Sequence, residues 1–114
     1  MIEEHFRVTV NDRNIAAIRT LPDGHEYECV LVYAPGAGSN LHDPFGSYLA
    51  QHLAGAAIST VRFQFPYMEE RRRRPDPARL LEACWREVIQ TVRHDSGRLV
   101  VGGRSMGGRF LRYG

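Results

Sequence analysis

The chain has 114 residues, of which 43% are hydrophobic and 25% charged, with a formal net charge of +2 at pH 7. This length predicts one domain, residues 1–114, and the composition excludes disordered, collagen-like and disulfide-scaffold proteins. No apolar run approaches the roughly 20 residues of a membrane span, and the first residues lack the basic and then apolar pattern of a secretory signal. We therefore expect a cytoplasmic protein with no membrane partner. Cys29 and Cys84 fall in apolar segments, where reduced cysteine behaves as a small hydrophobe, so we expect no structural disulfide.

Short apolar segments separated by proline and glycine predict alternating strands and helices. Two alternating segments near the N-terminus indicate a hairpin, and the later apolar runs are typical of strands that helices cover on both faces. Asp43 and Asp76 each precede a proline, which is a signal for a helix N-cap. In chain order, we expect strands at 4–10, 14–20 and 29–34, a helix from 43 to about 54, a strand at 57–65 that Pro66 ends, a polar loop, a helix from 76 that Gly97 closes, a strand at 99–101 and a helical fragment from about 106.

This order of elements predicts an α/β fold with a mainly parallel sheet of about five strands, flanking helices and an antiparallel N-terminal hairpin at one edge. In the second helix, apolar residues recur at helical spacing. We expect this stripe, with Trp85 beside it, to pack in the core.

The strongest functional motif is the G-x-S-x-G sequence Gly103-Arg104-Ser105-Met106-Gly107. Its chemistry requires a strained turn between a strand and a helix, which lifts the serine hydroxyl above the carboxyl edge of the sheet. The motif follows the last predicted strand directly, so it reads as a nucleophile elbow with Ser105 as the nucleophile. The alternative is a glycine-rich phosphate-binding turn, but neither G-x-x-x-x-G-K-[ST] nor an intact G-x-G-x-x-G is present.

Attack by the serine creates an oxyanion, which two preorganised backbone N–H groups must stabilise. One is expected from Met106, the residue after the nucleophile, and the other from Ala37, in the loop after the strand at 29–34. The flanking Gly36 and Gly38 are also consistent with a plain tight loop, which stays open as an alternative.

Three segments, residues 33–38, 62–75 and 101–109, together resemble small α/β-hydrolases related to dienelactone hydrolase, including the KANL/Tex-type hydrolase-like proteins. The resemblance spans nearly the whole chain, although only the N-terminal half of such a protein. It implies the α/β-hydrolase fold and esterase-like hydrolysis of a small-molecule substrate through Ser105, with no cofactor and no metal. Gly36, Gly38, Tyr67 and Arg104 are candidates for substrate binding.

The arginine run at 71–74 follows two acidic residues, Glu69 and Glu70, and no aromatic platform follows it. This pattern favours a solvated loop with local ion pairs over a nucleic-acid site. The resemblance implies that this loop lies near the active-site edge of the sheet. Binding of a substrate carboxylate by these arginines is therefore kept as an alternative. Tyr67 and Met68 either line the pocket or pack under the loop.

The triad of this fold follows the chain order serine, acid, histidine. Residues 106–114 contain no Asp, Glu or His, and we expect His42, the nearest histidine to the oxyanion loop, to be a solvated neighbour of a helix cap. We therefore expect a truncation or frameshift relative to the family, and whether the chain is an active enzyme stays open. The alternative is a catalytically inactive hydrolase-like fragment or interaction module that self-associates through the exposed edge of its last strand.

Overall fold

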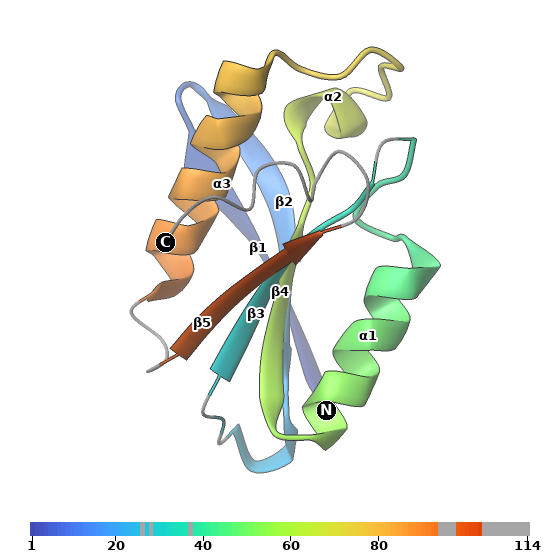
Figure 1. Ribbon diagram of the computed structural model, residues 1–114, viewed down its shortest axis with the longest axis vertical. Coiled ribbons are helices and arrows are strands. Elements are labelled where there is room, and N and C mark those ends of the chain that lie inside the picture. The colour runs from blue at the N-terminus through green and yellow to red at the C-terminus, as the bar shows by residue number, and fades with distance from the viewer. Residues whose placement is uncertain (26, 28, 37, 94–97, 104–114) are drawn as a thin grey trace.

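A five-stranded sheet with helices on both faces forms the framework of the computed structural model (Figure 1). The structure describes residues 1–25, 27, 29–36, 38–93 and 98–103. Its elements are β1 (Ile2–Val10), β2 (Arg13–Leu21), the short 3-10 helix η1 (Asp23–His25), β3 (Cys29–Ala34), α1 (Pro44–Gly55), β4 (Ile58–Phe63), α2 (Pro66–Glu69), α3 (Ala78–Val92) and β5 (Arg98–Gly103). The predicted α/β fold is confirmed.

The strands are arranged in the order β1-β2-β4-β3-β5. The hairpin β1–β2 is antiparallel and lies at one edge, as predicted. Strand β2 also pairs with β4 in an antiparallel arrangement. The remaining strands, β4, β3 and β5, are parallel to one another. Their carboxyl ends therefore meet at a single edge of the sheet, which is where open α/β folds bind ligands.

The main core lies between the sheet and α3. Trp85 is completely buried and meets Phe63 edge to face, with ring centroids 5.0 Å apart. Phe65 packs against Phe63 in the same manner at 5.3 Å. Aromatic pairs of this geometry add stabilisation beyond the burial of their area. The predicted core role of Trp85 and of the apolar stripe beside it is confirmed.

Both cysteines are free thiols. Cys84 lies fully buried on the inner face of α3, and burial, together with the charge of Asp76, raises the pKa of its thiol to about 12. A thiol in this environment behaves as the small hydrophobe that the sequence predicted.

Helix α1 covers the opposite face of the sheet and approaches it closely at Gly46. A Cβ atom at this position would lie 2.9 Å from Cε1 of Tyr33 and 3.4 Å from Cδ of Arg62. Only glycine therefore allows this close packing of helix on strand. Arg62 is 4% exposed and its guanidinium pairs with Glu3 at 3.0 Å, so the charge that the helix buries has a partner.

The structure corrects two predictions about the middle of the chain. We expected a polar loop after Pro66, but residues 66–69 form a turn of helix, α2. Proline ends a strand, but its fixed φ also suits the first position of a helix, which Pro66 occupies here. We also expected Asp76 to cap α3. The N-cap is Pro77, and the Asp76 carboxylate accepts hydrogen bonds from the Tyr67 N–H and from Arg72.

Other local predictions are confirmed or lie outside the described residues. Asp43 caps α1, since its Oδ1 accepts the Phe45 N–H at 3.3 Å. The predicted helix closure at Gly97 and the helical fragment from 106 fall on residues that are not described. Of the described helices, none combines the length and the apolar character that a bilayer crossing needs.

Candidate active site

Two loops that carry predicted catalytic residues leave the sheet side by side. Strands β3 and β5 pair in parallel, and the register places Ala34, the last residue of β3, opposite Gly103, the last residue of β5. The chain reaches position 37 three residues after the first of these ends and Ser105 two residues after the second. Ala37, Arg104, Ser105 and Met106 themselves lie outside the described residues, whereas Gly36, Gly38 and Tyr67 lie within them.

The loop between β3 and α1, residues 35–43, is a compact turn. The Ser39 N–H donates to the Gly36 carbonyl at 3.1 Å, and Gly38 has a φ of +81°, in the left-handed region that glycine adopts without strain. Further on, the His42 N–H donates to Oδ1 of Asn40 at 2.8 Å. The His42 residue is exposed beside the cap of α1, as predicted. These internal hydrogen bonds join Gly36 to Ser39 and Asn40 to His42 within the described part of the loop.

Side chains from outside the loop fix its second half. The Tyr33 hydroxyl donates to Oδ2 of Asp43 at 3.0 Å, which joins the end of β3 to the start of α1. The Leu41 N–H donates to Oε1 of Gln64 at 2.9 Å, which joins the loop to the residue just after β4. An oxyanion hole works only if its donors are preorganised, and anchors of this kind supply preorganisation.

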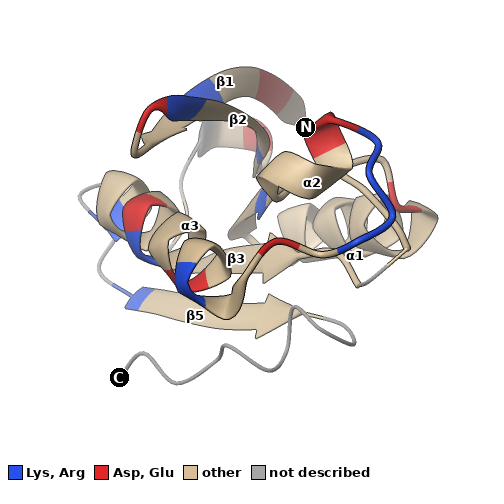
Figure 2. Cartoon of the chain, turned by 90° about the horizontal axis from the view of Figure 1, so that it is seen from above, with Lys and Arg blue, Asp and Glu red and all other residues tan. Residues whose placement is uncertain are grey.

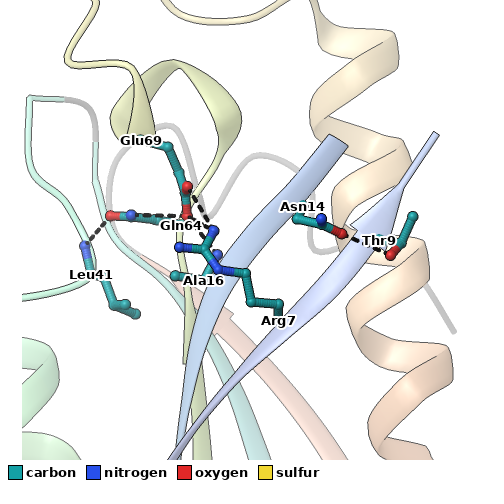
Figure 3. Close-up of polar contacts among 7 residues, drawn as sticks. All are labelled: Arg7, Thr9, Asn14, Ala16, Leu41, Gln64 and Glu69. Atoms are coloured by element: carbon teal, nitrogen blue, oxygen red, sulfur yellow. Dashed lines mark hydrogen bonds and ion pairs between the residues drawn. The ribbon is translucent and has the colours of Figure 1, made fainter. Parts of the chain in front are cut away.

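Gln64 is itself held by the carboxylate of Glu69 (Figure 3). Its Nε2 donates to Oε1 of Glu69 at 3.2 Å, and the same oxygen accepts the Ala16 N–H. Arg7 pairs with the other carboxylate oxygen at 3.1 Å. Burial acts to raise the pKa of Glu69, but the hydrogen bonds from Ala16, Gln64 and Arg7 outweigh it, so the pKa lies below its ordinary value. The ionised carboxylate thus links the N-terminal hairpin to the loop at 35–43.

No role was predicted for Gln64, and Glu69 was expected only as one of two acidic neighbours of the arginine run; its described ion pair is with Arg7 instead. Gln64 is a polar residue between two buried phenylalanines, Phe63 and Phe65, at the end of a predicted strand. That position carried a signal, because a polar side chain in an apolar run needs a partner when it is partly buried. Glu69 gave no comparable signal, since two of its partners, Arg7 on β1 and Ala16 on β2, are distant in sequence.

A pocket of about 290 Å³ opens between the loop at 35–43 and the segment after β4. Gly38, Ser39 and Asn40 line it on one side, and Tyr67, Met68 and Arg71–Arg73 on the other. Two predicted substrate-binding residues, Gly38 and Tyr67, are therefore brought together. Tyr67 and Met68 are also buried members of the core, which confirms that they pack under the loop, and a contact with substrate stays a prediction.

Larger hollows lie elsewhere. One, of about 750 Å³, lies at the amino ends of the parallel strands, beside Cys29, Ala57 and Arg98. Another, of about 710 Å³, lies between the hairpin turn and the start of α3. The first is at the opposite end of the strands from the carboxyl edge where chemistry is expected in this class of fold. The second is lined by no residue of the loop at 35–43 and by none of β3 or β5 among the described residues. Within the described ranges, no group of three or more His, Cys, Asp or Glu side chains is placed to hold a metal ion.

The parallel strands, the flanking helices and the tight loop after β3 define an α/β-hydrolase type of protein. Residues 27–112 match the family model of the alpha/beta hydrolase domain, and the chain therefore belongs to that family. The superfamily expected from the sequence is confirmed. None of the curated proteins matches the chain.

Solved structures agree with this assignment. Dienelactone hydrolase from Anabaena variabilis is 25% identical, with a TM-score of 0.77 over 96% of this chain and 55% of that protein. An α/β serine hydrolase homologue from Coxiella burnetii is 22% identical, with a TM-score of 0.77 over 94% and 54% of the two chains. A cold-adapted esterase from an Arctic intertidal metagenomic library is 16% identical, with a TM-score of 0.77 over 95% and 52%. The chain thus spans about half the length of these structures.

Proposed function

We propose that this protein is a serine hydrolase that cleaves small-molecule esters through Ser105, with the backbone N–H groups of Met106 and Ala37 as oxyanion donors. The observation that carries the proposal is the register of β3 and β5. Because Ala34 and Gly103 are paired, the loop with Ala37 and the G-x-S-x-G motif start beside each other at the carboxyl edge. Membership of the hydrolase family, over a match that includes Ser105, supports the same assignment.

In this reaction the Ser105 oxygen attacks the ester carbonyl carbon while a general base takes the hydroxyl proton, and the carbonyl oxygen becomes the oxyanion that the two N–H groups bind. Collapse of this intermediate breaks the bond to the alcohol oxygen, which receives that proton, and leaves an acyl-serine. Water, deprotonated by the same base, then hydrolyses the acyl-serine to the acid and restores the serine hydroxyl. A serine hydroxyl needs a base to take its proton, and residues 106–114 contain no histidine and no acidic residue. The proposal therefore assigns to this chain the nucleophile and the oxyanion donors alone.

A fluorophosphonate probe tests the nucleophile directly. We expect a covalent adduct whose mass maps to Ser105, no adduct in Ser105→Ala, and undiminished labelling in Ser47→Ala. Ser47 lies on α1, outside the pocket, and serves as the matched control. Labelling of the native protein that does not exceed that of Ser105→Ala would contradict the proposal.

The free edge of β5 favours a second candidate function, a non-catalytic interaction module. Among the described strands β5 pairs with β3 alone, and Val100 on it is 51% exposed. An apolar edge strand is a template for pairing with another chain. If this function holds, light scattering will show a dimer or larger species that Val100→Lys disperses, whereas a monomer at micromolar concentration would exclude self-association.

A further inference from the structure

Arg62 on β4 is buried, although most charged residues of this protein lie on its outside. The charged stretches of β1 and α3 and the basic segment after α2 lie at the surface (Figure 2). Arg62 is 4% exposed and is the one buried cation among the described residues. Taking a charge out of water is costly, and apolar side chains of similar volume often stabilise a fold as well as a buried ion pair does. Stability alone therefore gives no reason for an arginine at this position.

Arg62 belongs to a row of paired residues that crosses the sheet. The register places Ile18 of β2 on one side of Arg62 and Tyr33 of β3 on the other. Tyr33 is paired in turn with Gly102, the residue before the end of β5. The row therefore lies next to the carboxyl edge of the sheet, where the loop at 35–43 and the G-x-S-x-G motif begin.

The side chains next to Arg62 connect it to the start of α1. A Cβ atom on Gly46 would meet both the Tyr33 ring and Cδ of Arg62, so these two side chains lie together under the first turns of the helix. The Tyr33 hydroxyl donates to Oδ2 of Asp43 at 3.0 Å, and the Phe45 N–H donates to Oδ1 of the same carboxylate at 3.3 Å. The residue that caps α1 is therefore bound from the sheet on one side and from the helix on the other.

Two carboxylates act on the Arg62 guanidinium. Its Nη2 donates to Oε2 of Glu3 on β1 at 3.0 Å, which ties the cation to the N-terminal hairpin. Burial lowers the pKa of Arg62, and the charges of Glu3 and Asp43 act in the opposite direction. An arginine keeps its proton in proteins, so the Asp43 carboxylate is attracted by a permanent positive charge. Because this attraction acts in a largely buried place, solvent screens it little.

We propose that Arg62 is a positioning residue for the proposed oxyanion site. Its charge holds the Asp43 carboxylate against the sheet, and Asp43 ends the loop that carries the proposed donor Ala37. Together with the anchor at Leu41, this ties the second half of the loop to the sheet at two points. Donors of an oxyanion hole need such preorganisation. The catalytic part of this inference rests on the proposed hydrolase function, whereas the anchoring of the loop does not.

Arg19 on β2 supplies a matched control. Like Arg62, it pairs with a glutamate of β1, since its Nη1 lies 3.9 Å from Oε1 of Glu4. Successive side chains of a strand point to opposite faces, so Arg19 shares the face of Ala17, in the core under α3, and not the face that α1 covers. Arg19→Met therefore makes the same substitution as Arg62→Met in the same sheet, without a contact to the cap of α1.

Amide hydrogen exchange in the full chain measures the anchoring and needs no catalytic turnover. In Arg62→Met we expect the Leu41 and Phe45 amides to exchange at least about tenfold faster, relative to the Val32 amide within the sheet. The comparison with Val32 removes any change in global stability. Arg62→Lys keeps the charge and should restore both amides to within about threefold of the native rate. Arg19→Met should leave them within about twofold.

A second variant makes the test independent of how well Arg62→Met folds. Asp43→Asn keeps an oxygen for the Phe45 N–H but removes the charge that Arg62 attracts, and we expect at least about fivefold faster exchange at Leu41. Three results overturn the anchoring: native exchange at Leu41 in both Arg62→Met and Asp43→Asn, equal acceleration in Arg62→Met and Arg62→Lys, or equal acceleration of Val32. The last of these is what a merely structural role would give.

Fluorophosphonate labelling of the same samples tests the catalytic part. Labelling of Ser105 should slow at least about tenfold in Arg62→Met and recover in Arg62→Lys. Faster loop exchange with an unchanged labelling rate would overturn the positioning role. Absence of labelling in the native protein would reject the nucleophile, and faster loop exchange in Arg62→Met would then still support the anchor.

Discussion

Two loops at the carboxyl edge of the sheet differ in how their polar and charged groups are paired. In the described part of the loop at 35–43, main-chain and side-chain polar groups bond to one another or to Tyr33 and Gln64. The arginine loop, residues 70–76, is anchored by one buried carboxylate, that of Asp76, and its charged side chains lie beside the pocket. The contrast shows two uses of polar groups at one edge of the sheet, since the first loop uses them to hold its own main chain and the second leaves charged side chains facing solvent.

Removing the anchor of the arginine loop should have the largest effect on stability. Asp76→Ala leaves the Tyr67 N–H unpaired and Arg72 without its buried partner, and we expect a loss of about 2–3 kcal/mol in the free energy of unfolding. Asp76→Asn keeps an acceptor for the N–H and should cost about 1 kcal/mol. Urea unfolding measures both, and equal losses in the two variants would show that the Tyr67 hydrogen bond is not the anchor.

Breaking the anchor of the other loop should cost less but should be visible locally. Gln64→Leu leaves the Leu41 N–H without its acceptor, and we expect a loss of about 1–2 kcal/mol. Amide hydrogen exchange at Leu41 should become at least about tenfold faster, in line with easier local opening. Thr9→Val is the matched control, because it removes an exposed hydrogen bond to Asn14 in the same region (Figure 3) and should leave the Leu41 exchange rate unchanged.

The smallest effect concerns the charge of Glu69 and depends on pH. Glu69→Gln keeps an acceptor for the Ala16 N–H but loses the ion pair with the exposed Arg7, which is worth about 0.5 kcal/mol. The pKa of Glu69 is lowered in the folded protein, so its charge stabilises the fold above the unfolded value and this contribution is lost as the pH falls through the folded value. The difference in unfolding free energy between native protein and variant should therefore be largest near pH 7 and vanish in acid. A difference that grows on acidification would contradict this assignment.

The sequence predicted the features that local patterns encode. The hairpin, the buried parallel strands and the Asp43 cap could all be predicted, since periodicity and capping depend on a few neighbouring residues. The role of Asp76 could not be predicted from the sequence. An aspartate before a proline either caps a helix or accepts a hydrogen bond from a distant N–H, and only the packed fold decides between the two. The link from Ala16 through Glu69 and Gln64 to Leu41 was hidden for the same reason, since it joins four separate stretches of chain.

The central claim is that the loops after β3 and β5 together form an oxyanion site around Ser105. A crystal structure of the fluorophosphonate-labelled protein tests it most directly. We predict phosphorus bonded to Oγ of Ser105 and its non-bridging oxygen about 2.7–3.1 Å from the backbone nitrogens of both Ala37 and Met106. An adduct on another residue, or an oxygen on Ser105 that contacts neither nitrogen, would contradict the account.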